Sequence, residues 1–240
     1  MSPHLAQSGH WPNRPVFLLF FTCCTFVVYS ARRGGGNAGK RYDRFLVHRR
    51  EHLYYLTVSR LHEVEAANGI RFRWRPFNAR AIMQEMNNVP FATKPIKLAY
   101  MWRDIERRAS RYDLPLKVPA PYPLKNFDLA SRVAVLGETE GWCPNYVRAS
   151  YRRWFVEGKE VGAEPNLSES LSEIGQDPNR VIAAANAETI GRAYDANTHE
   201  ARRLNIFGSP TFVVRGELFW GDDRLEDALA WQTNGTLRPA

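Results

Sequence analysis

The chain has 240 residues, of which 44% are hydrophobic and 24% charged, and its 33 Lys and Arg outnumber its 25 Asp and Glu. This is the composition of a globular protein, and it excludes a disordered tail, a collagen-like chain and a coiled-coil fibre. Residues 1–50 hold eight basic residues and one acid, so they carry almost all of the net charge of +8. The nearly neutral remainder predicts no nucleic-acid partner.

The first 44 residues contain an apolar run at 16–29 in which only Thr22 and Thr25 are polar. As a helix it would span about 21 Å, less than the ~30 Å of a bilayer core. Only Arg14 precedes the run and most basic residues follow it, which is opposite to the charge order of a signal peptide. A non-structural extension, a weak membrane anchor and a cleaved signal remain open, and membrane contact is expected only from an anchor. We expect residues 1–44 to be a basic and apolar extension outside the fold.

Regular patterns follow from about residue 45. An amphipathic helix that includes Leu56, Arg60 and Leu61 is predicted to end at Asn68, before Gly69. Alternation over 70–74 predicts a strand. Helical patterns then continue to about residue 205, with starts near residues 95, 144 and 178. Apolar residues of the first of these helices form one stripe: Ile96, Tyr100, Ile105, Ala109 and Tyr112.

The end of the chain returns to strand character, at 211–214 and 217–220 around an Arg-Gly turn, and a last helix is expected over 224–231. This order predicts an α/β protein with a thioredoxin-like fold interrupted by a helical insertion domain. Residues 45–76 and 196–235 would form the discontinuous thioredoxin-like domain, and residues 77–195 the insertion.

Cysteine usage limits the chemistry. The chain has only Cys23, Cys24 and Cys143 and no Cys-x-x-Cys motif. This excludes a zinc ribbon and a dithiol redox centre, so no metal site is expected. Three cysteines without a disulfide framework favour a reducing compartment, and we expect a cytoplasmic protein.

Two short motifs offer binding chemistry. Pro210 opens a predicted buried strand, where a cis bond after Ser209 would expose a backbone edge to an extended peptide such as glutathione. A plain turn explains the same residues. Asp222 and Asp223 stand at a predicted helix start, where acids either satisfy free amides or hold the ammonium group of a ligand.

Together these stretches resemble a known family. Residues 207–214 and 217–225, with 73–77 and 97–105, are similar to the 2-hydroxychromene-2-carboxylate isomerases, which are DsbA-like relatives of kappa-class glutathione transferases. The resemblance covers about residues 54–235 and implies a homodimer with glutathione as cofactor. The implied glutathione-binding residues are Asn88, Lys97, Asp104, Ser209, Pro210, Asp222 and Asp223.

The resemblance also implies roles for these residues. Lys97 would face the glycine carboxylate of glutathione, and Asp104 would reach the γ-glutamyl end of the tripeptide bound by the partner subunit. Asp222 and Asp223 would bind the γ-glutamyl group of the chain's own glutathione. Asn88 would lie near the active centre, while the backbone of Ser209 and Pro210 would pair with the cysteinyl unit.

The catalytic position departs from the family pattern. Glu51 stands where the family has its serine, and a carboxylate there would raise the pKa of the glutathione thiol. Residues up to about 53 are an artefact on a normal enzyme, or the protein is a weakly active or inactive relative, or Tyr54 or Tyr55 supplies the hydroxyl. The catalytic residue therefore stays unassigned.

The expected activity is glutathione-dependent cis–trans isomerisation of a small aromatic carboxylate, an oxo-acid of aromatic catabolism, by reversible thiolate addition. The alternatives are a kappa-like transferase and a catalytically impaired glutathione-binding protein.

Overall fold

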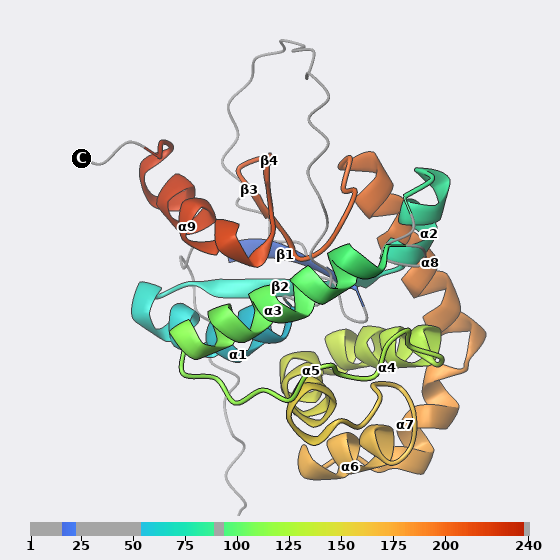
Figure 1. Cartoon of the computed structure of the whole chain (residues 1–240). Coiled ribbons are helices and arrows are strands. Elements are labelled where there is room, and N and C mark those ends of the chain that lie inside the picture. The colour runs from blue at the N-terminus through green and yellow to red at the C-terminus, as the bar shows by residue number, and fades with distance from the viewer. Residues whose placement is uncertain (1–15, 23–53, 89–93, 238–240) are drawn as a thin grey trace, which may run out of the picture.

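The computed structural model describes residues 16–22, 54–88 and 94–237 (Figure 1). The elements of the thioredoxin-like part are β1 (Val16–Thr22), α1 (Tyr54–Asn68), β2 (Arg71–Phe77), β3 (Thr211–Val214), β4 (Glu217–Trp220), the 3-10 helix η3 (Asp222–Arg224) and α9 (Leu225–Asn234). The helices between β2 and β3 are α2 (Ala79–Glu85), α3 (Pro95–Arg111), α4 (Phe127–Glu140), α5 (Cys143–Arg152), the π-helix η2 (Arg153–Glu157), α6 (Asn166–Glu173), α7 (Pro178–Ala185) and α8 (Glu188–Arg203).

The sheet has the strand order β2-β1-β3-β4, with β1 parallel to β2 and antiparallel to β3. A tight hairpin joins β3 to β4. Its two turn residues, Arg215 and Gly216, both have positive φ (52° and 85°), as a two-residue turn matched to the twist of the strands requires. A parallel pair followed by an antiparallel hairpin is the expected thioredoxin-like arrangement.

The position of β1 corrects one prediction. Residues 1–44 were expected to lie outside the fold, but residues 16–22 pair with β2 on one side and with β3 on the other. Strands of parallel α/β sheets are often continuous apolar runs without alternation, and residues 16–22 have such a sequence. The same pattern fits a signal or anchor segment, and periodicity alone does not separate the two. Residues 45–53, the predicted start of the domain, lie outside the described residues.

Some of the other predicted boundaries hold, and others do not. α1 ends at Asn68, and Gly69 follows with φ 62°. β2 extends through Pro76, which an edge strand tolerates because one side of its backbone needs no ladder partner. α8 continues across residue 195, where the insertion was predicted to end.

The predicted stripe of α3 is wrong at its beginning. Ile96 and Tyr100 are 86% and 57% exposed, whereas Ile105 and Ala109 are buried as expected. Met101, Ile105 and Ala109 face the core. The first turns of α3 therefore present apolar side chains away from it.

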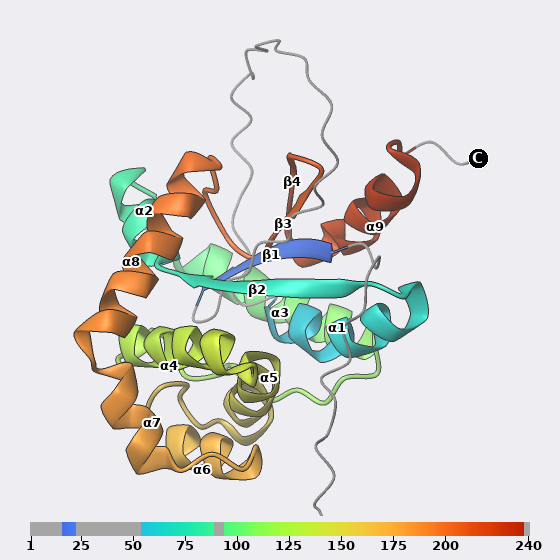
Figure 2. The same cartoon turned by 180° about the vertical axis from the view of Figure 1, so that it is seen from behind.

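The helices surround the sheet on several sides. Figure 1 shows α3 crossing in front of the strands, and Figure 2 shows it behind them. In both views α4–α7 stand together below the sheet, and α8 runs along the side from α7 to α2. Among the described residues, no helix combines the length and the apolar character needed to cross a membrane.

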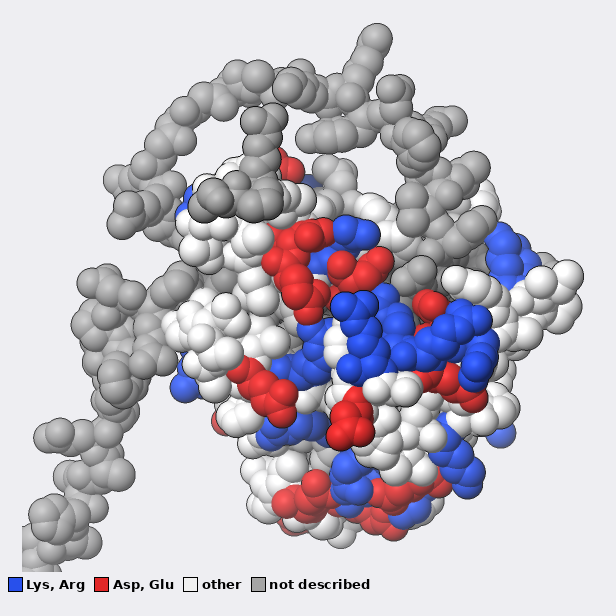
Figure 3. Space-filling view, turned by 60° about the vertical axis from the view of Figure 1, so that its left-hand side comes forward, with Lys and Arg blue, Asp and Glu red and all other residues white. Residues whose placement is uncertain are grey.

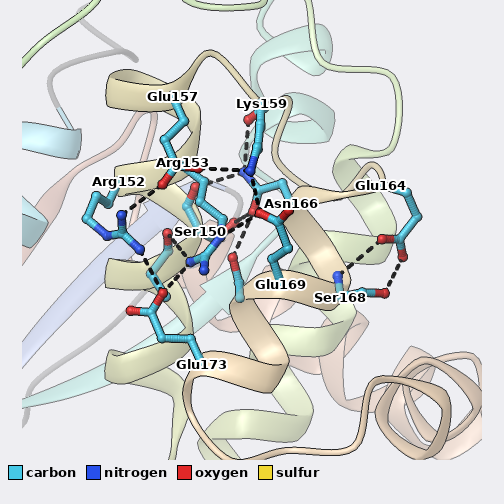
Figure 4. Close-up of polar contacts among 12 residues, drawn as sticks. Ser150, Arg152, Arg153, Glu157, Lys159, Glu164, Asn166, Ser168, Glu169 and Glu173 are labelled. Atoms are coloured by element: carbon cyan, nitrogen blue, oxygen red, sulfur yellow. Dashed lines mark hydrogen bonds and ion pairs between the residues drawn. The ribbon is translucent and has the colours of Figure 1, made fainter.

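One cluster of charges fixes the lower helices to one another (Figure 4). Arg153 pairs with Glu169 at 3.2 Å and with Glu173 at 2.6 Å, while Lys159 bridges Glu157 and Glu169. We call these residues, together with Arg152, the α5–α6 ion-pair network. Multiple partners for each charge hold the π-helix against α6, which makes the network more effective than isolated surface pairs.

Elsewhere the surface charges are mixed. Figure 3 shows Lys and Arg side chains next to Asp and Glu side chains on the face that it brings forward. Short-range pairs such as Arg103–Glu106 at 2.9 Å and Arg224–Asp227 at 2.6 Å are typical of the surface. Each such exposed pair contributes at most about 1 kcal/mol.

Candidate functional site

The loop before β3 is tied to the turn before η3. The Ser209–Pro210 peptide bond is cis, and both residues are buried. The backbone N–H of Gly221 donates to the Pro210 carbonyl at 2.9 Å. The hairpin thus brings the predicted cis-proline edge beside the predicted acid pair, as the resemblance implies.

Gly208 lets the indole ring of Trp220 approach this loop. A Cβ at position 208 would lie 2.6 Å from Nε1 of Trp220, closer than any real contact. The Thr211 hydroxyl donates to the Gly208 carbonyl at 2.7 Å. The loop is therefore held by both strands of the hairpin.

Asp222 is engaged inside the protein. Its side chain has no exposed surface; the Thr57 hydroxyl donates to Oδ1 at 2.8 Å, and the Arg108 guanidinium pairs with Oδ2. Nη1 of Arg60 lies 3.7 Å from Oδ1. Burial raises the pKa of the Asp222 carboxyl above its ordinary value of 3.8, and Arg108 opposes this effect. Asp222 thus connects α1, α3 and η3.

Asp223 has a different environment. Its side chain is 36% exposed, and Nη2 of Arg224 lies 3.5 Å from its carboxylate. Gly221 has φ 113°, and a Cβ there would lie 2.5 Å from Oδ1 of Asp223. The carboxylate therefore folds back over Gly221, toward the residue that binds the cis-proline loop, and still reaches solvent.

α3 carries Lys97 and Asp104 on one stripe. Both are half-buried, and their spacing of seven residues separates them by about 10 Å along the axis. Nη1 of Arg107 lies 3.9 Å from Oδ1 of Asp104. Arg108, one turn further, contacts Asp222, so the stripe leads toward the acid pair.

Asn88 lies at the end of α2, where its N–H donates to the Met83 carbonyl at 2.8 Å. Residues 89–93, which include the rest of its motif, lie outside the described residues, as do Glu51 and His52. In the part of the chain that the structure describes, no hydrogen bond or ion pair joins Asn88 to the other predicted residues.

Tyr55, in the first turn of α1, has an internal role. Its hydroxyl donates to the Pro115 carbonyl at 2.6 Å, and its ring stacks on Phe155 with the centroids 5.2 Å apart. Burial raises the pKa of the Tyr55 hydroxyl. These contacts do not favour Tyr55 as a donor to a bound sulfur.

Sequence reasoning missed the partners of Asp222. Arg60 stacks on the Tyr112 ring, with its guanidinium carbon 3.9 Å from the centroid, and pairs with Glu226. Its place on the apolar face of α1 was the available signal, because a cation on such a face needs a carboxylate partner. Arg108 gave no signal of this kind. No group of three or more His, Cys, Asp or Glu side chains in the described residues is arranged to hold a metal ion.

Comparison with known proteins identifies the family of this chain. The DSBA-like thioredoxin domain matches residues 55–230. The chain belongs to this family. The match confirms the predicted DsbA-like fold, and its span begins in the first turn of α1.

Relatives of this DSBA-like chain carry two names. A 2-hydroxychromene-2-carboxylate isomerase of Sphingobium xenophagum is 23% identical over 174 residues, which cover 72% of this chain and 88% of the relative. Glutathione S-transferase kappa 1 of Caenorhabditis elegans is 24% identical, covering 65% and 74%. A solved 2-hydroxychromene-2-carboxylate isomerase superimposes with a TM-score of 0.67 at 25% identity, covering 78% of this chain and 95% of that one. The predicted relation to both groups is confirmed.

Proposed function

We propose that the protein is a glutathione-dependent isomerase of the 2-hydroxychromene-2-carboxylate type, acting in aromatic catabolism as a homodimer in the cytoplasm. The hydrogen bond between Gly221 and Pro210 carries the proposal, because it joins a cis-proline edge to a partly exposed acid. The isomerase relatives and the superimposed structure support the reaction type.

The residues present fit the two charged ends of glutathione. Asp223 would hold the γ-glutamyl ammonium, since its carboxylate reaches solvent beside the loop. Lys97 would hold the glycine carboxylate, and Asp104 would face the tripeptide of the partner subunit. Asp222 does not fit a ligand, because three internal groups already surround its buried carboxylate. We therefore assign Asp222 to holding η3, and Asp223 to binding.

When bound, glutathione supplies a thiolate that adds reversibly to a conjugated double bond, so that this bond can rotate before the thiolate leaves. The chain's part is to hold the tripeptide along the cis-proline edge by Ser209 and Pro210. Asp223 and Lys97 fix its two charged ends. Asn88 would help at the active centre. The group that stabilises the thiolate is unassigned, because Glu51 lies at the family's serine position.

Turnover assays test the proposal. Purified protein should convert 2-hydroxychromene-2-carboxylate only when glutathione is added, which the absorbance of the ring-opened product reports. Asp223→Ala should weaken glutathione binding by roughly 10- to 100-fold, the value of a charge-assisted hydrogen bond. Asp195→Ala, an exposed acid of α8, is the matched control. Unchanged binding in Asp223→Ala, measured by calorimetry, would exclude this placement.

A kappa-like transferase is the second candidate, favoured by the Caenorhabditis elegans relative. Conjugation of glutathione to chlorodinitrobenzene, without isomerisation, would support it. Glutathione binding with neither reaction would indicate the catalytically impaired alternative.

A further inference from the structure

A cavity of about 680 Å³ lies between the beginning of α3, the segment 117–122 and the end of η2. Its walls include Leu98 and Trp102 of α3, Lys117 and Tyr122 of the segment, and Glu157 and Gly158. The volume is within the roughly 300–1,000 Å³ of small-molecule sites. None of the predicted glutathione-binding residues lines it.

The cavity and the predicted glutathione site lie on different sides of α3. Successive residues of an α-helix are rotated by about 100°. Leu98 and Trp102 therefore point about 100–160° away from the stripe that carries Lys97 and Asp104. α3 thus contributes a different face to each of the two sites.

The charge inside the cavity is positive. Glu157 is neutralised within the α5–α6 ion-pair network, by Arg152 at 2.8 Å and Lys159 at 2.9 Å (Figure 4). Lys117 has no ion pair with any described residue, and its Nζ would lie 3.9 Å from a Cβ added to Gly158. The exposed ammonium therefore stands at the cavity beside an acid whose charge is already compensated.

The wall that carries Lys117 is fixed in place. The Lys117 N–H donates to the Phe155 carbonyl at 2.7 Å, and Trp154 Nε1 donates to the Pro121 carbonyl at 2.8 Å. Tyr55 holds Pro115, two residues before Lys117. The wall is therefore attached both to η2 and to the first turn of α1. Little ordering is needed when a ligand binds, which favours affinity.

We propose that this cavity binds the aromatic ring of the substrate beside Trp102 and Tyr122, with the substrate carboxylate on Lys117. This inference rests on the proposed function for the identity of the substrate. An aromatic acid satisfies both features of the cavity, because the rings offer flat apolar surface and the ammonium offers a charge-assisted hydrogen bond. Lys117 is then the residue of the helical insertion that selects carboxylates.

Binding of 2-hydroxycinnamate, a stable planar aromatic acid, tests the proposal without glutathione. Calorimetry should show that the acid binds and that its methyl ester binds much more weakly. Lys117→Met should lower the affinity for the acid roughly 10- to 100-fold. Lys117→Arg should retain most of the affinity. Lys125→Met, which removes an exposed lysine outside the cavity, should bind like the unchanged protein.

Equal binding of acid and ester, or the same loss in Lys117→Met and Lys125→Met, would overturn the proposal. Turnover separates this outcome from failure of the proposed function. If the isomerase is active but Lys117→Met leaves its KM unchanged, the cavity assignment fails and the function stands. If the acid binds through Lys117 and no isomerisation occurs, the cavity assignment stands and the function fails.

Discussion

Replacing Arg108 with methionine would leave the carboxylate of Asp222 buried without its main partner. Asp222 has no exposed surface and Arg108 is only 15% exposed. Removing one member of a buried ion pair costs about 3–5 kcal/mol. Thr57 and Arg60 remain near the carboxylate, so we expect the lower end of this range. A loss of about 3 kcal/mol lowers the Tm of a chain of this size by roughly 6–12 °C.

The loss of stability in Arg108→Met should also depend on pH. Burial already raises the pKa of Asp222, and removal of Arg108 raises it further. A carboxyl whose pKa is higher in the folded state stabilises the fold fully below its unfolded pKa of about 3.9, and this stabilisation is lost as the pH rises through the folded pKa. The difference in unfolding free energy between the unchanged protein and Arg108→Met should therefore widen as the pH rises through the folded pKa of the unchanged protein toward the higher one of the variant, by at most about 1.4 kcal/mol per pH unit.

Thermal and urea denaturation followed by circular dichroism would measure both effects. Arg111→Met removes an exposed arginine of the same helix and should shift the Tm little. Arg108→Met combined with Asp222→Asn should recover most of the loss, because the uncompensated charge is gone. A shift below about 3 °C in Arg108→Met, or no recovery in the double variant, would refute the reasoning.

Three further predictions concern packing and charge. Gly162→Ala should destabilise the protein far more than Gly175→Ala. The φ angles of the two glycines are nearly the same (76° and 75°), but only at position 162 would the added Cβ lie 2.5 Å from a carbonyl oxygen, that of Asn126. Equal midpoints of urea unfolding would contradict this. Tyr55→Phe should lose about 1 kcal/mol of unfolding free energy with its hydrogen bond to Pro115, and an unchanged midpoint in urea would show that this bond contributes nothing. A hydrogen bond from Lys159 lowers the pKa of Glu169 in the α5–α6 ion-pair network below 4.5. The stability that this pair contributes is therefore present above the unfolded pKa of Glu169 and is lost as the pH falls through the folded pKa. Acid denaturation checks this, because Lys159→Met should lose less stability below pH 4.5 than the unchanged protein.

Local sequence signals predicted much of the fold because they depend on neighbouring residues. The Arg215-Gly216 turn and the Asn68-Gly69 stop act within one turn, so the hairpin and the end of α1 could be placed. The proximity of Pro210 to Asp222 follows from the same hairpin.

Long-range features could not be placed in this way. Arg108 and Asp222 are 114 residues apart, and nothing near either residue identifies the other. On α3, Ile96 and Tyr100 continue the helical spacing of the core residues, yet the chain leaves them outside. Helical spacing shows which residues share a face, but it does not show how far along the helix the core extends.

The pairing of β1 has a consequence for the order of folding. The backbone of residues 18–20 pairs with residues 211–213, near the opposite end of the chain. Contacts between such distant segments make folding slow, because a long loop must close before they form. During synthesis, β1 leaves the ribosome long before β3. The sheet can therefore be completed only after residues 211–214 have been translated, and until then β1 lacks its partner on one edge.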